Sequence, residues 1–151
     1  MASASIGQSV VQITPLQLAR AYSVFANGGW LVTPHLADQG LNWTEPPRRT
    51  KVLIQPTTLN TIREGLRKVV SEGTGFGLNG PGIPSAGGKT GTAEDSTGGP
   101  DHAWFATYAP YPEGQIVIVA FAQNTPGGGS VHALPMAKKV MEVWNRTRTQ
   151  S

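Results

Sequence analysis

The spacing of apolar residues along the chain predicts three helices. The first covers 15–26, where Thr14 provides a hydroxyl cap, Pro15 takes the first helical position and Gln17 completes a capping box. Asn27 and the two glycines that follow it end the helix. Nearly every residue of this helix is apolar, and a helix without a polar face is usually covered on most sides. We therefore expect the helix to be surrounded by the rest of the fold.

The other two predicted helices are amphipathic. The helix over 57–71 has one apolar stripe, and its other side is predicted to face water through Asn60, Arg63, Glu64, Arg67 and Lys68. The helix over 132–145 has an apolar face made by Ala133, Met136, Ala137, Val140, Met141 and Trp144. The polar residues 146–151 are predicted to be a frayed tail, so the chain divides into a domain over 1–145 and this tail.

Two stretches of the chain clearly predict strands, 102–109 and 115–123. The second contains Ile-Val-Ile-Val-Ala-Phe-Ala without polar alternation, which is typical of a strand covered on both faces. A short strand is predicted over 30–33, followed by a polar, proline-containing stretch. A glycine-rich turn over 125–129 leads from the last strand into the last helix.

Composition supports one globular domain and excludes several classes of protein. The 151 residues include 19 Gly and 12 Pro, but 38% are hydrophobic, which argues against a collagen-like or disordered chain. The longest apolar run, 116–122, is too short to span a membrane, and the first residues lack the pattern of a signal peptide. The net charge of +3 is spread along the chain and indicates no nucleic-acid partner. Without cysteine there is no disulfide and no thiolate metal site.

The most informative segment is 85–94, Ser-Ala-Gly-Gly-Lys-Thr-Gly-Thr-Ala-Glu, which we expect to be a strand. In an extended strand, Lys89 and Gly91 share one face, and Thr90 and Thr92 share the other. Glycines leave room for another backbone, so a ligand could lie along the strand. Lys89 then offers a positive charge to an anionic group, and the hydroxyls orient that group.

Two other interpretations of this segment have to be weighed. Gly-Lys-Thr also ends the phosphate-binding loop of nucleotide-binding proteins, but that motif needs a glycine at the position of Ile83 and a helix after the threonine. The second alternative is a glycine-rich turn that carries a solvated lysine.

The surrounding sequence favours a third interpretation. Gly-Lys-Thr-Gly-Thr-Ala-Glu over 88–94, then His-Ala-Trp-Phe-Ala-Thr-Tyr-Ala-Pro over 102–110, closely resembles penicillin-binding proteins. So does the upstream block Ile-Thr-Pro-Leu-Gln-Leu-Ala over 13–19. The three blocks stand in the family's order, and the resemblance runs from about Ile6 to Trp144. It is greatest to the C-terminal part of the transpeptidase domain of the monofunctional, class B kind.

The resemblance implies a fold and a set of roles. The fold is α/β (α+β), with an antiparallel sheet flanked by helices and the strands 85–94, 102–109 and 115–123 in consecutive order. The family cleaves D-Ala-D-Ala stem peptides and β-lactams through a serine ester. By this resemblance, Lys89, Thr90 and Thr92 bind the substrate's terminal carboxylate, Gly91 keeps the strand open, and the N–H of Thr92 donates to the oxyanion. Two further strands complete the sheet in the family, so the edge of 115–123 should be unpaired here.

No serine of this sequence can be assigned the role of nucleophile. None has Lys three residues later, as Ser-x-x-Lys requires, and none has Asn two residues later. His35, His102 and His132 share no metal-like spacing, so we predict no metal and no cofactor, and His102 is interpreted as a strand-end histidine. Glu94, Asp95 and Asp101 are interpreted as solvated loop acids, and Trp104, Phe105 and Tyr108 as core and cleft wall. We therefore assign no catalytic residue.

The sequence thus predicts part of a peptidoglycan D,D-transpeptidase domain that recognises D-Ala-D-Ala peptides and β-lactams but lacks its nucleophile. Its expected partners are those ligands and the upstream half of the domain, and the resemblance implies a place in the cell envelope, on the outer face of the cytoplasmic membrane or in the periplasm. The alternatives are a non-catalytic peptide-binding or interaction module and, less favoured, a nucleotide-binding protein.

Overall fold

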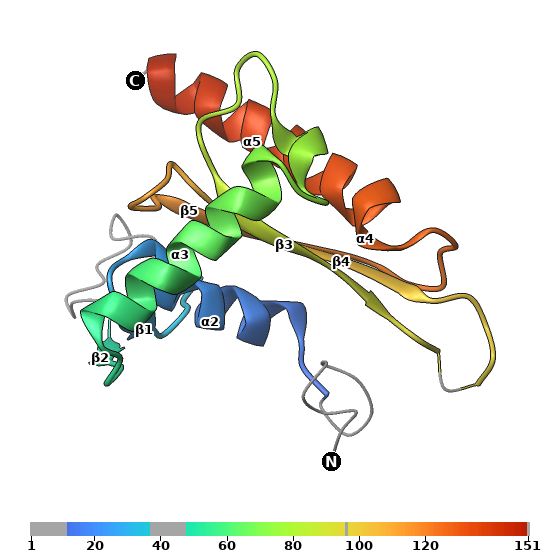
Figure 1. Cartoon of the computed structure of the whole chain (residues 1–151), viewed down its shortest axis with the longest axis horizontal. Coiled ribbons are helices and arrows are strands. Elements are labelled where there is room, and N and C mark those ends of the chain that lie inside the picture. Colours follow the sequence, from blue (N-terminus) through green and yellow to red (C-terminus); the bar gives the residue numbers. More distant parts are fainter. Residues whose placement is uncertain (1–11, 37–47, 96, 151) are drawn as a thin grey trace.

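The structure is a computed structural model that describes residues 12–36, 48–95 and 97–150. Its centre is a three-stranded antiparallel sheet of β3 (Gly87–Ala93), β4 (His102–Ala109) and β5 (Ile116–Ala122), in the order β3-β4-β5 (Figure 1). The predicted strands and their consecutive order are confirmed. Within the described residues, β3 and β5 are the two edges of this sheet.

Helices cover both faces of the sheet, as predicted (Figure 1). Because neighbouring side chains of a strand point to opposite faces, β4 supplies both halves of the core. Phe105 belongs to the cluster with Met141 of α5 (Ala133–Gln150), whereas Ala106 and Tyr108 belong to the cluster with Tyr22 of α2 (Pro15–Ala26). The third long helix, α3 (Pro56–Ser71), packs along β3.

The capping box predicted for α2 is present. The Thr14 hydroxyl accepts from the Gln17 N–H at 3.2 Å, and the Gln17 side chain accepts from the Thr14 N–H at 2.8 Å. The prediction that the helix is surrounded holds only for its C-terminal half, where its buried residues lie, from Tyr22 to Ala26. Leu16, in the first turn of the helix, is 62% exposed.

The prediction that Arg63 faces water is wrong. Arg63 is only 8% exposed, and its guanidinium donates from Nε to the Phe25 carbonyl at 2.7 Å and from Nη2 to the Ala26 carbonyl at 3.5 Å. These carbonyls lie at the C-terminal end of α2, where the last helical carbonyls lack partners inside the helix and attract a cation. Arg63 therefore joins α3 to the end of α2.

The last helix also differs from its prediction. α5 continues to Gln150, so residues 146–150 are helical rather than a frayed tail, and Ser151 lies outside the described residues. Arg148 stabilises this extension, because it lies 4.9 Å from the centre of the Trp144 ring and donates to the side chains of Gln115 at 3.1 Å and Asn145 at 3.0 Å. Of the predicted apolar face, Met136 and Val140 are about half exposed.

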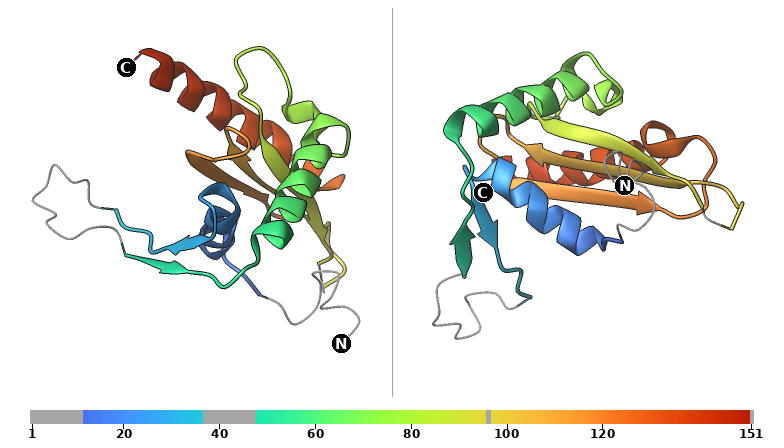
Figure 2. Two further views of the ribbon diagram at one scale, coloured as in Figure 1. Left: turned by 60° about the vertical axis from the view of Figure 1, so that its left-hand side comes forward. Right: turned by 60° about the horizontal axis from the view of Figure 1, so that its bottom comes forward.

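In the described residues, four short elements accompany the main ones. β1 (Trp30–Val32) was predicted one residue longer, and its antiparallel partner β2 (Arg49–Lys51) was not predicted, because Arg-Thr-Lys carries no apolar signal. Figure 2 shows this pair extending away from the main sheet. The 3-10 helix η2 (Phe76–Leu78) and the short helix α4 (Gly128–Val131) lie in glycine-rich segments. The polar stretch over 37–47 and the start of the family resemblance at Ile6 lie outside the described residues.

Candidate active-site strand

The candidate ligand-binding residues lie on β3, an edge strand of the main sheet in the described structure. Lys89 and Gly91 pair with Ala106 and Trp104 of β4, on the face that α2 covers. Thr90 and Thr92 pair with Phe105 and Ala103, on the face that α5 covers. Because directly opposite residues of an antiparallel pair point to the same face, the predicted division of this strand into a Lys/Gly face and a Thr/Thr face is confirmed.

The two glycines before Lys89 are required by packing within the sheet. A Cβ atom on Gly87 would lie 2.9 Å from a ring carbon of the buried Tyr108, and one on Gly88 would lie 2.9 Å from the Ala106 carbonyl oxygen. These glycines therefore let β3 approach β4, and they give no independent evidence for a ligand. At Gly91 the nearest atom to an added Cβ is the Trp104 Cβ at 3.3 Å, so the strand is less crowded there.

Lys89 is exposed and carries the positive charge of the site. Its ammonium donates to the neighbouring Thr90 carbonyl at 2.6 Å, and in the described parts of the chain it forms no ion pair. The predicted loop acids do not neutralise it. Asp95 instead accepts from the N–H of Thr97 at 3.0 Å and from its hydroxyl at 2.8 Å, and these hydrogen bonds lower the pKa of Asp95. The Lys89 ammonium is thus available to an anionic ligand.

The two threonine hydroxyls have different surroundings. The Thr90 hydroxyl lies 2.7 Å from the hydroxyl of Thr74, which belongs to the loop after α3. The exposed Thr92 packs against Gly128 of α4, where an added Cβ would collide with the Thr92 hydroxyl. Thr74 was missed by sequence reasoning, because nothing in its local sequence marks a contact with a residue 16 positions away.

The remaining candidate residues have structural roles. His102 begins β4 as predicted, and its Nδ1 accepts from the Asn124 N–H at 3.1 Å. Phe105 and Tyr108 are fully buried. Burial raises the pKa of Tyr108 to about 12, so its hydroxyl is neutral at physiological pH. No cluster of possible metal-ligating side chains occurs among the residues that the structure describes.

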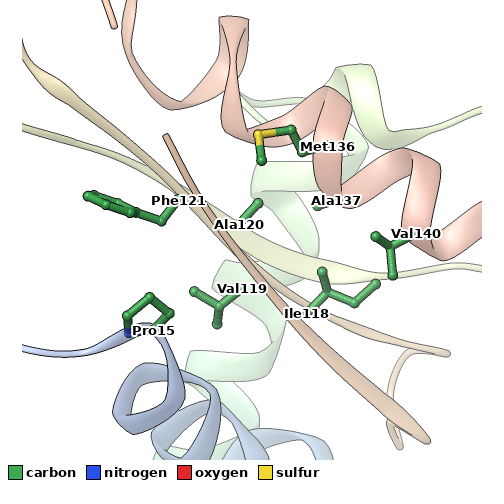
Figure 3. Close-up of a pocket in the computed structure, with 8 residues that line it drawn as sticks. All are labelled: Pro15, Ile118, Val119, Ala120, Phe121, Met136, Ala137 and Val140. Atoms are coloured by element: carbon green, nitrogen blue, oxygen red, sulfur yellow. The ribbon is translucent and has the colours of Figure 1, made fainter. Parts of the chain in front are cut away.

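At the opposite edge of the sheet, β5 is flanked by an apolar pocket of about 370 Å³. Figure 3 shows β5 between Pro15 of α2 and the side chains of α5, and the pocket is lined by Pro15, Ile118, Val119, Ala120, Phe121, Met136, Ala137 and Val140. In the described structure β5 is an edge strand of this sheet.

The antiparallel sheet, its flanking helices and the β3 strand are those expected of the transpeptidase domain of penicillin-binding proteins, and comparison with known proteins agrees. The family model "Penicillin binding protein transpeptidase domain" matches residues 1–142, and the chain belongs to this family, in its class B branch. The interpretation of this segment as a phosphate-binding loop is wrong, because Gly88-Lys89-Thr90 lies within β3 and does not open a helix.

Curated relatives match nearly the whole chain. The peptidoglycan D,D-transpeptidase MrdA of Haemophilus influenzae is 33% identical over 97% of this chain and 26% of its own length. Stage V sporulation protein D of Bacillus subtilis is 33% identical over 93% of this chain and 24% of its own length. The chain therefore spans about a quarter of the length of each of these two relatives.

Solved structures give the same result. PBP2 of Helicobacter pylori aligns with a TM-score of 0.76 and 26% identity, over 95% of this chain and 26% of that one. Pseudomonas aeruginosa PBP2, in complex with WCK 5153, aligns with a TM-score of 0.73 and 31% identity, over 92% of this chain and 32% of that one. In the described part of the chain, no helix combines the length and the apolarity needed to cross a bilayer. The relatives act on peptidoglycan in the cell envelope.

Proposed function

We propose that β3 binds the terminal carboxylate of D-Ala-D-Ala stem peptides and of β-lactams. The observation that carries this proposal is the exposed Lys89 ammonium on one face of β3 and the hydroxyls of Thr90 and Thr92 on the other, so that a ligand lying along this edge strand of the transpeptidase-domain fold could reach all three. The ammonium attracts the carboxylate, and the two hydroxyls donate to its oxygens. The N–H of Thr92 is the proposed donor to the oxyanion that forms during acyl transfer.

We further propose that these 151 residues recognise the ligand without forming the acyl-enzyme. An ester intermediate needs a serine activated by a neighbouring base. No Ser-x-x-Lys occurs in the sequence. The Ser85 hydroxyl, which lies shortly before β3, donates to the Tyr111 carbonyl at 3.3 Å and has no basic hydrogen-bond partner among the described residues. The contribution of this chain is thus one wall of the cleft.

The apolar edge at β5 supports a second part of the proposal, which concerns the partner. We infer that the upstream half of the transpeptidase domain packs against β5 and the pocket beside it, because the eight lining residues are all apolar and the edge strand offers unpaired backbone groups. An uncovered edge of this kind promotes aggregation, so co-expression of the upstream half should increase the soluble yield.

Peptide binding tests the recognition of the carboxylate. We expect diacetyl-L-Lys-D-Ala-D-Ala to bind the chain more tightly than the same peptide with a C-terminal amide, as measured by NMR titration of the ¹⁵N-labelled protein. Thr90→Val and Thr92→Val should each reduce this preference, since each removes one donor to the carboxylate. Equal affinity for the acid and the amide would show that β3 does not recognise the carboxylate. In that case the non-catalytic interaction module becomes the better interpretation.

A further inference from the structure

We propose that Thr74 is a positioning residue that orients the Thr90 hydroxyl toward the ligand carboxylate. This inference rests on the function proposed for β3. The two hydroxyl oxygens are 2.7 Å apart, which is the usual distance of an O–H···O hydrogen bond. Thr74 is exposed and Thr90 is half-buried, so the pair lies at the surface of the site rather than in the core.

The loop that carries Thr74 is held firmly in place. The N–H groups of Gly73 and Gly75, on either side of Thr74, both donate to the Val69 carbonyl, at 3.1 and 2.9 Å. Both positions are crowded, because a Cβ on Gly73 would lie 3.0 Å from the Val69 backbone and one on Gly75 would lie 3.1 Å from the Val69 carbonyl oxygen. The buried Leu78 anchors the following turn in the core. This loop therefore holds the Thr74 hydroxyl at a fixed position beside β3.

The beginning of β3 is tied to α3 as well. Arg67 on α3 donates from Nη1 to the Ala86 carbonyl at 3.1 Å, immediately before the strand. Arg67 of α3 thus contacts the residue that precedes β3. Thr74, in the loop after α3, contacts the strand itself at Thr90. Two fixed points of this kind reduce the freedom of the Thr90 hydroxyl relative to α3.

The direction of the hydrogen bond between the two hydroxyls decides whether Thr90 can donate to the ligand. A hydroxyl has one proton to donate and two lone pairs to accept with. If Thr74 donates, the Thr90 oxygen is the acceptor and its own proton remains available to the ligand. The chain of donors Thr74 to Thr90 to carboxylate then forms when the anion binds, and each bond in such a chain strengthens the next. An anion beside Thr90 selects this direction, because the reverse one would turn a lone pair toward it.

The test compares Thr74→Val with Thr74→Ser in the acid and amide titrations described above. Loss of one hydrogen bond of about 0.5–1.5 kcal/mol corresponds to a loss of affinity of roughly 2- to 12-fold. We expect Thr74→Val to weaken binding of the acid peptide by about that factor and to leave binding of the amide peptide unchanged. Thr74→Ser should bind like the wild type. The matched control is Thr61→Val on α3, because its exposed hydroxyl donates to the Thr57 carbonyl, at 3.0 Å, within the same helix.

Combining the Thr74 and Thr90 substitutions distinguishes a positioning role of Thr74 from a general effect on the fold. Thr74→Val should add nothing to the loss caused by Thr90→Val, because Thr74 acts only through Thr90. If Thr74→Val does not fold, Thr74→Ala replaces it in the same comparison. The inference is overturned if the wild type prefers the acid and the Thr74 variants retain that preference, or if the acid and the amide weaken equally. A wild type with no preference for the acid overturns the proposed function itself, and this inference with it.

Discussion

The buried guanidinium of Arg63 allows a sharp test of how the fold around the site is held together. Arg63→Met keeps much of the side chain's length and apolar volume but removes its donors. The bond from Nε to the Phe25 carbonyl is short, at 2.7 Å, and involves a charged donor, so it contributes about 1.5–3 kcal/mol. The contact with the Ala26 carbonyl is long, at 3.5 Å, and that carbonyl also accepts from the Gly114 N–H at 2.8 Å. Its loss should therefore add little.

We expect Arg63→Met to lower the free energy of unfolding by about 2 kcal/mol, chiefly because the Phe25 carbonyl loses its partner. For a chain of this length, a loss of this size corresponds to a decrease of roughly 4–8 °C in Tm. Urea unfolding followed by circular dichroism measures the first quantity and a thermal melt the second. Arg146→Met is the matched control, because Arg146 is exposed on α5, and it should change stability by less than about 0.5 kcal/mol. If Arg63→Met is as stable as this control, Arg63 does not join α3 to α2.

Two further predictions concern Gly87 of β3 and Tyr108, the β4 residue with which it pairs. Gly87→Ala should destabilise the fold by about 1–3 kcal/mol, because the added Cβ would contact the Tyr108 ring. Gly65→Ala on α3, where an added Cβ meets nothing within 4 Å, should stabilise the fold by about 0.4–1 kcal/mol. Urea unfolding measures both changes, and equal effects would show that Gly87 is not required for packing against Tyr108. The pKa of Tyr108 is about 12 in the folded chain, above its ordinary value of 10.0, so its contribution to stability is complete below pH 10 and is lost as the pH rises to 12. Tyr108→Phe should therefore raise the pH midpoint of alkaline unfolding, and an unchanged midpoint would contradict this prediction. The same variant should lose little stability at pH 7, because the Tyr108 hydroxyl has no hydrogen-bond partner within the described structure.

Much of the fold followed from the sequence, because its main elements have strong local signals. The apolar runs of β4 and β5 and the single apolar stripe of α3 determine those elements almost alone. The strand that the sequence pattern did not predict, β2, and the helix that it predicted too short, α5, depend on contacts between distant residues. β2 is a strand because it pairs with β1, and the end of α5 is helical because Arg148 packs on Trp144 and bonds to Gln115.

The candidate site followed from the sequence only in part. The alternation of side chains along a strand was sufficient to place Lys89 and Gly91 on one face and Thr90 and Thr92 on the other. Thr74 and Arg63 could not be assigned in this way. The sequence around Thr74 reads as a turn, and the position of Arg63 on α3 reads as solvent-exposed, because the groups they contact lie 16 and 38 residues away along the chain.

Labelling with a fluorescent penicillin tests whether this chain supplies the recognition strand and not the nucleophile. The chain is expressed alone and together with the upstream half of the transpeptidase domain of the Haemophilus influenzae relative, and the polypeptides are separated before detection. We predict no label on this chain in either case, and label on the upstream half that requires the presence of this chain and decreases with Thr90→Val. A covalent adduct on this chain expressed alone would show instead that the chain carries a nucleophile of its own.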